Sequence, residues 1–508
     1  MTASATPLLA LSGDVYARAL DARDARFDGV FFVGITTTRI YCRPVCPSRI
    51  SFRSHRRFFG SAAAAEGAGF RPCLRCRPEL APGCAPVDAI PRLALAAARR
   101  IEAGALNGQS VSDLARSLGV SERHLRRAVE RELGVSPIAL AQTHRLLLAK
   151  RLLADTNLSV TRIAFASGFQ SLRRFNAAFR TQYRMPPSAL VRASHTASAG
   201  EFVRLTLSYR PPFAWRELCR VLARDAVGGV EIVEGARYGR TIRIGDRSGV
   251  FFAEDDSSRA RAIGDQGRRS TAAELRGAHN NVKIDVSPSL VPALMPLLAR
   301  LRQLFDLDAD PATIDGHLSQ GGLSACVARM PGIRIPGTVS GFDIALRVLL
   351  RGRLLTVPPA NDLAERVAHE IGEPIETGFA GLTHLAPSAA RIADAGSRRL
   401  HALGVPARRA EATVAVARLV ASDELTLEPG SDVIATRQAL MQLDGVGDQI
   451  ASYIVMRALS WPDAFPFACR TMAHVIGAPS ARAFRTLAQR WRPWRAYAAM
   501  HLADAPSD

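Results

Sequence analysis

The chain has 508 residues and a formal net charge of +20, with a sequence pI near 10.8. Its 48% apolar and 22% charged residues are ordinary for a globular protein, and the length suggests roughly three to four domains. No apolar run approaches the ~18 residues of a membrane span, and the N-terminus lacks the basic segment of a secretory signal. We therefore expect an intracellular protein with reduced thiols, and the positive charge favours a polyanion, most often nucleic acid.

Four cysteines near the N-terminus form two close pairs. Three residues separate Cys42 from Cys46, two separate Cys73 from Cys76, and 26 residues lie between the pairs. Two such thiol pairs can converge on one tetrahedral ion, and zinc prefers thiolates. Chance spacing or a disulfide pair would fit a reducing compartment poorly. The spacing therefore predicts one Zn²⁺ in a zinc-binding domain of residues 1–85, with purely structural zinc as the simplest role.

The words FFVGITTTRIYCRPVC and GFRPCLRCRP around these cysteines resemble the N-terminal domain of the Ada family, which belongs to the adaptive response to DNA alkylation. In that family four cysteines hold zinc, and the first irreversibly accepts a methyl group from a methylphosphotriester of the DNA backbone. The resemblance implies that Cys42 is the methyl acceptor and that Thr38 and Arg71 lie near the incoming phosphate. Arg39 stands where the family commonly has glycine, and it either adds a phosphate contact or crowds the approach.

The chemistry implied by this resemblance also gives a switch. A zinc-bound thiolate is deprotonated and stays nucleophilic. Four thiolates on a divalent ion carry a net charge of −2, and methylation of one thiolate lowers this to −1. Repulsion of DNA phosphate then falls, so DNA binding should tighten after repair. A transcription factor with structural zinc and no methyl transfer is the alternative that Arg39 leaves open.

Residues 86–195 have a nearly continuous helical pattern. The segments 111–134 and 160–183 resemble each other, since each has a short helix, a glycine turn and a longer second helix that starts after a serine. The segment 138–155 joins them with helical periodicity and no breaker. This arrangement predicts two helix-turn-helix units on one long helix.

The second unit contains the word GFQSLRRFNAAFR, which resembles the second-unit motif of AraC-type DNA-binding domains. Phe175 and Phe179 are expected to face the core, and Ser121 and Ser171 are expected to cap the second helices. A helical bundle with solvated arginine faces is the alternative. The side chains left for the major groove are Arg123, Arg126, Arg127, Arg173 and Asn176.

Beyond a linker near residues 194–200 the pattern changes to short strands, followed from about residue 290 by helices. The strands are expected at 202–208, 230–234, 241–244, 250–254 and 281–286, with a helix near 213–224. The predicted fold class is therefore multidomain and mainly α. Its parts are a zinc-binding domain (1–85), a double helix-turn-helix (86–195), a small α+β domain (200–290) and an all-α domain (291–508), which the resemblance given next implies to be a helix-hairpin-helix domain.

Several words of the second half resemble AlkA-type 3-methyladenine DNA glycosylases. They are LRQLFDLDADP (301–311), GLTHLAP (381–387), LDGVGDQIASYIVMRAL (443–459), DAFP (463–466) and RWRPWRAYAAMHL (490–502). In that family a helix-hairpin-helix grips the DNA backbone and the target base is flipped into a pocket. The resemblance implies that Gly445 and Gly447 let the hairpin N–H groups reach phosphate. The alternative is a simple turn between two helices.

The glycosylase chemistry departs from the family at three places. The family pattern DAFPxxD supplies an aspartate that stabilises positive charge on the sugar, and here that position is Cys469. Gln449 replaces a tryptophan, and RGRLLTV (351–357) replaces a glutamine-containing word. We expect a glycosylase-like scaffold without base excision. The alternative is a bifunctional regulator that still excises 3-methyladenine, with Asp463, which matches the family's non-catalytic acid, as the substitute.

Together these observations predict an alkylation-response regulator. It would take a methyl group from a DNA methylphosphotriester onto zinc-bound Cys42 and then bind promoter DNA. The expected partners are double-stranded DNA and RNA polymerase, without a membrane. A monomer is expected in the cytoplasm, associated with the nucleoid. The word PCHR of the guanine-O6 methyltransferase domain is missing from the sequence, so we do not expect that activity.

Overall fold

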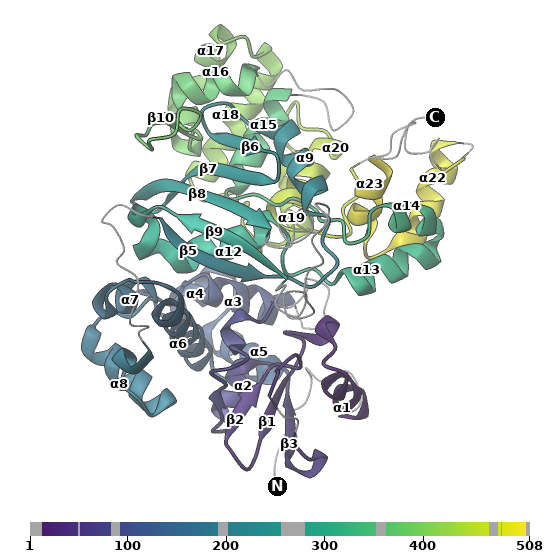
Figure 1. Cartoon of the computed structure of the whole chain (residues 1–508). Coiled ribbons are helices and arrows are strands. Elements are labelled where there is room, and N and C mark those ends of the chain that lie inside the picture. The colour runs from purple at the N-terminus through teal and green to yellow at the C-terminus, as the bar shows by residue number, and fades with distance from the viewer. Residues whose placement is uncertain are drawn as a thin grey trace, which may run out of the picture. The chain divides into compact units, whose positions relative to one another are not determined.

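The computed structural model describes residues 13–48, 51–82, 92–190, 202–255, 280–351, 362–466, 476–478 and 480–503 (Figure 1). The chain divides into two compact units. The first comprises residues 1–210 with 279–299, and the second comprises 211–278 with 300–508. In the part of the chain that is described, no helix is long and apolar enough to cross a bilayer.

The first unit begins with a small sheet in the strand order β3-β1-β2-β4. β1 pairs antiparallel with β2 and β3, whereas β4 runs parallel to β2. The strands are β1 (Phe32–Ile35), β2 (Ile40–Cys42), β3 (Arg56–Phe59) and β4 (Arg71–Pro72). The helices are α1 (Gly13–Asp21) and α2 (Ala62–Gly67), with one-turn helices η1 (Ala25–Phe27), η2 (Arg53–His55) and η3 (Pro78–Leu80).

The alternation of side chains along these strands gives the sheet two apolar faces. On one face Val33 and its neighbours pack with Tyr16 and Leu20 of α1. On the other face Tyr41 and Phe70 pack with Ala65 of α2. Because successive strand residues point to opposite faces, Cys42 lies on the face of α1 while Tyr41 lies on the face of α2.

A helical segment follows in the same unit. Its helices are α3 (Arg92–Glu102), α4 (Val111–Ser117), α5 (Glu122–Leu133), α6 (Pro137–Asp155), α7 (Val160–Ala166), α8 (Leu172–Tyr183) and η4 (Pro187–Leu190). Each of α4 to α8 begins after a serine whose hydroxyl accepts a backbone N–H three residues later. The predicted caps Ser121 and Ser171 are thus confirmed. Phe175 and Phe179 are fully buried, as predicted.

The first unit is completed by β5 (Val203–Ser208) and β9 (Asn281–Val286), which pair antiparallel, and by η5 (Pro288–Ala293). α12 (Leu294–Leu304) follows η5. Alternate residues of both strands are buried, because Leu205 and Leu207 pair with Ile284 and Val282. The two strands were predicted at these positions.

The second unit starts with α9 (Trp215–Asp225) and the antiparallel meander of β6 (Glu231–Glu234), β7 (Arg237–Ile244) and β8 (Arg247–Asp255). Short strands β10 (Glu373–Pro374) and β11 (His384–Leu385) pair separately. The remaining helices are α13 (Pro311–Leu318), η6 (Ser319–Leu323), α14 (Ser324–Arg329), α15 (Gly341–Arg351), α16 (Asp362–Ile371), α17 (Ala389–Ala402), α18 (Ala407–Ala421), α19 (Val433–Met441), α20 (Asp448–Ala458), α22 (Ala481–Leu487), η7 (Ala488–Trp491) and α23 (Arg495–Ala503).

A buried network of charges joins the meander to α15. Arg240 contacts Glu231 and Asp343 at 2.7 Å each, and Arg347 contacts the same two acids at 2.6 and 2.9 Å. The two arginines and two carboxylates compensate each other, so none is left as an unpaired buried charge. The network fixes the meander against the helices of the second unit.

Candidate metal centre and nucleic-acid interface

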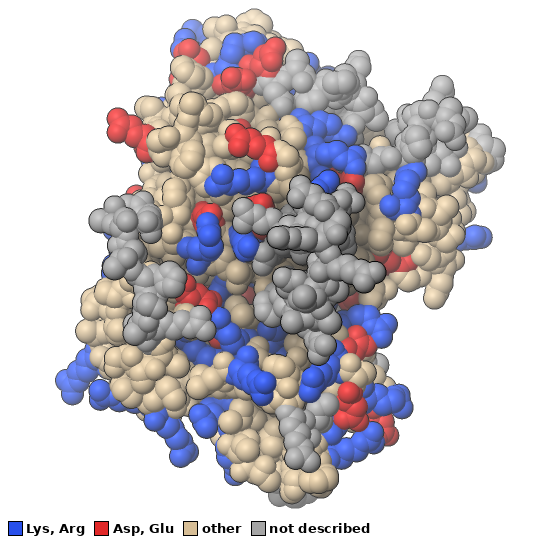
Figure 2. Space-filling model, in the orientation of Figure 1, with Lys and Arg blue, Asp and Glu red and all other residues tan. Residues whose placement is uncertain are grey.

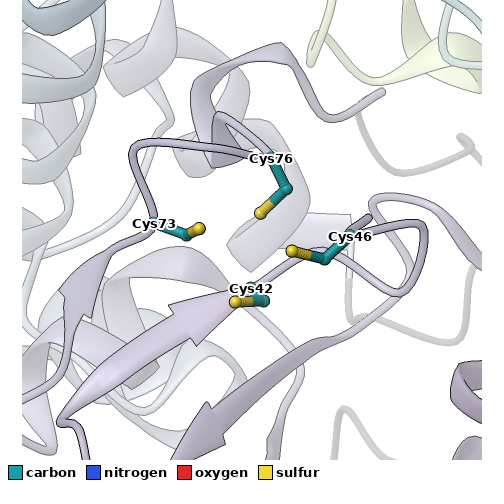
Figure 3. Close-up of side chains that lie close together, drawn as sticks. All are labelled: Cys42, Cys46, Cys73 and Cys76. Carbon is teal, nitrogen blue, oxygen red and sulfur yellow. The ribbon is translucent and has the colours of Figure 1, made fainter. Parts of the chain in front are cut away.

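The four N-terminal cysteines meet at one edge of the small sheet. Cys42 ends β2, Cys73 directly follows β4, and the parallel pairing of these strands places the two ends side by side. Cys46 and Cys76 come from the loops that follow. The four sulfur atoms lie within 4.8 Å of one another and point into a common space (Figure 3). Cys42 is half-buried, whereas the other three are buried.

This arrangement fits a zinc ion. Zinc–sulfur bonds of about 2.3 Å in a tetrahedron place sulfurs roughly 3.8 Å apart, and the separations of at most 4.8 Å between these sulfurs are compatible with such a site. The backbone N–H of Arg43 donates to the sulfur of Cys76, and that of Arg75 to the sulfur of Cys73, each at 3.4 Å. Such donors stabilise thiolates. The four cysteines therefore form a site for one Zn²⁺, as predicted.

The close approach of the four thiols shifts their pKa values in different directions. Hydrogen bonding to Cys46 raises the pKa of Cys42, and hydrogen bonding to Cys42 lowers the pKa of Cys73. A divalent ion removes the remaining protons, because it binds the thiolate form. Metal binding and proton release are therefore coupled at this centre.

A buried ion pair supports the centre from the side of Cys76. Arg43 Nε donates to Asp28 Oδ1 at 2.8 Å, and its Nη1 donates to the backbone carbonyl of Cys76 at 3.2 Å. The backbone carbonyl of Asp28 in turn accepts a hydrogen bond from the buried Arg210 at 3.2 Å. Sequence reasoning missed Asp28 because no motif places it near the cysteines.

A second set of ion pairs, here called the α6 clamp, ties the metal centre to α6. Lys150 Nζ donates to the backbone carbonyl of Cys73 at 3.0 Å and to Glu79 Oε2 at 2.6 Å. Arg77 donates to both carboxylate oxygens of Asp155, at 2.6 and 2.7 Å. Lys150 and Glu79 are almost fully buried, so this contact is protected from solvent screening. The α6 clamp consists of Lys150, Glu79, Arg77 and Asp155.

Glu66 of α2 makes a further polar contact with α6. Its carboxylate accepts from the Tyr41 hydroxyl at 3.0 Å and from the Thr143 hydroxyl at 2.7 Å. Burial raises the pKa of Glu66 to about 7, against its ordinary value of 4.5. The protonated form is therefore favoured in the folded chain below neutral pH.

This raised pKa predicts a pH-dependent stability. Between pH 4.5 and about 7 the folded state keeps a proton on Glu66 that the unfolded state loses, so the free energy of unfolding should fall as pH rises. The loss should reach about 3 kcal/mol at most. Glu66→Gln should remove this part of the slope, measured as the difference from the wild-type chain in urea unfolding between pH 5 and 8. The exposed Glu130→Gln is the control, and identical slopes for the wild-type and Glu66→Gln chains would contradict the prediction.

The residues predicted near the incoming phosphate lie around the turn between β1 and β2. Thr38 and Arg39 are exposed, and Arg71 is half-buried. The backbone N–H of Arg71 donates to the carbonyl of Arg39 at 2.8 Å. Arg39 has a φ of 54°, a left-handed conformation that costs a residue with a side chain roughly 1–2 kcal/mol. This conformation explains in physical terms why glycine suits the position.

The predicted major-groove residues lie on the second helix of each helix-turn-helix. Arg123 and Arg127 on α5 and Arg173 on α8 are exposed, and Asn176 is half-buried. Arg126 differs, because it pairs with Glu122 one turn earlier, at 2.6 Å. Figure 2 shows Lys and Arg side chains on the surface where Figure 1 places α8. Exposed Arg174 and Arg180 on that helix were not singled out from the sequence.

In the second unit α19 and α20 form the helix-hairpin-helix. Gly445 has a φ of 86°, and a Cβ atom there would lie 3.2 Å from the Cβ of Ala412. Gly447 caps α20 and has open space where a side chain would be. The hairpin borders an open hollow lined by residues 441–447, Arg408 and Arg409. Backbone N–H groups at such a hairpin can donate to phosphate.

The structure describes only some of the residues at which the glycosylase-like region departs from the family, together with Asp463. Asp463 is buried and held by two arginines, Arg492 at 2.9 Å and Arg495 at 2.7 Å. Gln449 is exposed on the first turn of α20. Cys469 and all of RGRLLTV except its first residue, Arg351, lie outside the described residues.

Three family models match successive segments of the chain. The metal binding domain of Ada matches residues 16–79, a helix-turn-helix domain matches 114–193, and the AlkA N-terminal domain matches 204–340. These matches follow the order of the metal centre, the paired helices and the α+β segment. They confirm the predicted fold class.

One relative extends over nearly the whole chain. The Mycobacterium tuberculosis protein named "Probable bifunctional transcriptional activator/DNA repair enzyme AlkA" is 37% identical over 496 residues, which cover 96% of this chain and 95% of the relative. The chain belongs to this AlkA family. Two Escherichia coli relatives each match part of this chain. DNA-3-methyladenine glycosylase 2 is 31% identical over 58% of this chain and 95% of its own length. The bifunctional transcriptional activator/DNA repair enzyme Ada is 34% identical over 31% of this chain and 43% of its own length.

Proposed function

We propose that this AlkA-family chain senses DNA alkylation by taking a methyl group from a backbone methylphosphotriester onto Cys42, and that it then binds promoter DNA to regulate transcription. The observation that carries this proposal is the uneven burial of the four-cysteine centre. Cys42 is half-buried at the end of β2, while the other three thiols are buried. The accessible thiolate can serve as the acceptor and the others as permanent zinc ligands.

Cys42 supplies the nucleophile of the proposed reaction, and neighbouring residues contact the phosphate. The thiolate sulfur of Cys42 attacks the methyl carbon, the carbon–oxygen bond of the phosphotriester breaks, and the phosphodiester leaves with the electron pair. Zinc, when bound, keeps the sulfur deprotonated and reactive at neutral pH. We assign Thr38, in the turn before β2, and Arg71, on β4, to contact with the incoming phosphate. The transfer exchanges a thiolate for a neutral thioether, so the chain reacts once.

The same exchange supplies the regulatory signal. The centre changes from −2 to −1, which lowers its repulsion of DNA phosphate. The exposed arginines of α5 and α8 contribute major-groove reading, and two units on α6 let one chain read two groove segments. We therefore place the function in a monomer that contacts RNA polymerase at promoters in the nucleoid, with the four domains at the predicted boundaries.

We propose that the glycosylase-like half binds or packs against DNA without base excision. Cys469 replaces the family aspartate, and the arginines around Asp463 support a structural role for that acid. A second candidate, base excision by this half, is favoured by one observation: the Mycobacterium tuberculosis relative is named as a DNA repair enzyme, and the Escherichia coli relative that matches this half is named as a 3-methyladenine glycosylase.

The decisive experiment exposes the purified chain to DNA that carries methylphosphotriesters. Mass spectrometry should then place one methyl group on Cys42, and affinity for promoter DNA should rise. The gain should shrink at high salt, because it comes from reduced charge repulsion. Cys42→Ala is the matched variant and should remain unmethylated. Methylation of another cysteine, or equal affinity before and after exposure, would overturn the proposal.

A further inference from the structure

Two exposed arginines in the zinc-binding segment lie over the same buried ring. The guanidinium carbon of Arg39 is 5.6 Å from the centroid of Phe70, and that of Arg57 is 5.9 Å from the same centroid. Arg57 is also 5.3 Å from the ring of Phe59. Phe70 is almost completely buried against α2, so it forms a fixed support for both cations.

The strand register explains how the two side chains reach this place. Gly34 of β1 lies between Arg57 on β3 and Tyr41 on β2. A Cβ atom on Gly34 would come within 2.8 Å of both the Phe59 and the Phe70 rings. The missing side chain lets the two rings lie under the sheet surface, and the arginines cover them.

Arg39 and Arg57 differ from the neighbouring arginines in their ion pairing. Arg53 and Arg56 contact Asp21 at 3.3 and 2.8 Å. Within the part of the chain that the structure describes, neither Arg39 nor Arg57 forms an ion pair with a carboxylate. Two exposed cations over one ring repel each other, and an external anion between them relieves that repulsion.

The position of the pair indicates which anion this is. Arg39 follows Thr38, and its carbonyl accepts from Arg71, so the surface runs from the predicted phosphate approach to Arg57. A methylphosphotriester is electrically neutral, so it offers the protein no charge attraction of its own. Orientation of the damaged strand must therefore come from the charged phosphodiesters beside it.

We propose that Arg39 and Arg57 form a phosphate clamp that positions the DNA strand next to the methylphosphotriester. This proposal rests on the proposed methyl transfer and names Arg57 as a positioning residue for it. The clamp also offsets the repulsion between the dianionic zinc centre and the DNA backbone. Arg39 then contributes a contact that glycine at this turn does not supply.

The test uses the full-length zinc-loaded chain and duplex DNA with one methylphosphotriester. The second-order rate of methyl transfer is measured at several salt concentrations for the wild type, Arg57→Ala, Arg39→Gly and the double variant. Each substitution should lower the rate several-fold at low salt. The slope of log rate against log salt should become shallower by about one unit per arginine, the change expected for one lost phosphate contact.

Arg53→Ala is the matched control, because it removes the same charge from an arginine that already contacts Asp21. It should leave rate and slope nearly unchanged. Arg57→Lys keeps the charge and should retain most of the slope, which separates phosphate binding from loss of ring packing. Zinc content and circular dichroism should match the wild type throughout.

The outcomes separate this proposal from the one it rests on. If the wild-type chain transfers no methyl group, the proposed function is refuted. If the wild-type chain transfers methyl, and Arg57→Ala and Arg39→Gly keep its rate and salt slope, the phosphate clamp alone is overturned. An equal loss in Arg53→Ala would show that overall charge is responsible, which also overturns it.

Discussion

Replacement of Cys73 by serine is expected to release the zinc ion and unfold the N-terminal segment. Structural zinc contributes about 10–16 kcal/mol of apparent binding free energy at neutral pH, and that energy is available only to the folded state. The sheet has two small apolar clusters, one on each face, which offer little reserve against such a loss. A serine hydroxyl stays protonated at neutral pH and is a poor zinc ligand.

Metal analysis should give one zinc per chain for the wild type and none for Cys73→Ser. Hydrogen exchange of residues 32–72 should rise toward that of an unfolded segment. Cys219→Ser is the matched control, because Cys219 is a buried thiol on α9 that is not one of the four clustered cysteines. A metal-free variant whose N-terminal segment stays folded would refute the zinc assignment.

Purified protein is expected to release no measurable 3-methyladenine or 7-methylguanine from alkylated DNA. Cleavage of the glycosidic bond develops positive charge on the sugar, and a carboxylate at the position of Cys469 would stabilise it. Loss of one such stabilising group costs on the order of 10²–10³ in rate. Asp463 is a poor substitute, since Arg492 and Arg495 hold its carboxylate in a buried ion pair.

Base release from alkylated DNA, followed by chromatography, checks this expectation. Cys469→Ala should leave methyl transfer and promoter binding unchanged. Cys469→Asp should restore trace excision at best, because Gln449 and RGRLLTV still depart from the family words. Robust release by the wild-type chain would reject the expectation, and its loss in Asp463→Asn would identify that acid as the substitute.

The metal centre was predictable because its determinants are local in sequence. Two short cysteine pairs define it, and the parallel pairing of β2 with β4 joins them. The core positions Phe175 and Phe179 followed equally well from helical spacing. Arg39 shows the limit of that reasoning. Comparison with the family shows that Arg39 replaces a glycine, but only the φ of 54° explains why glycine suits the turn.

Contacts between distant segments could not be predicted in this way. Lys150 and Glu79 are 71 positions apart, and neither belongs to a motif. Arg57 and Arg39 share a ring only because three strands bring them together around Gly34. The ion pair between Arg126 and Glu122 is different, because the two residues are four apart on one helix and their spacing alone could have indicated it.

The α6 clamp also fixes the spacing between the zinc-binding segment and the two helix-turn-helix units. α6 joins the two helix-turn-helix units. Lys150 and Asp155 of α6 bind Cys73 and Arg77 of the zinc-binding segment directly. The sulfur of Cys42, which we propose as the methyl acceptor, and the two helices that we propose to read the major groove, α5 and α8, are then held at fixed distances from one another along α6. A promoter would have to present its backbone phosphates to the zinc segment in constant phase with the two groove sequences. Insertion of roughly 5 base pairs, half a helical turn, between them would rotate the phosphates to the opposite side of the duplex and disengage the zinc segment while the helices remain bound.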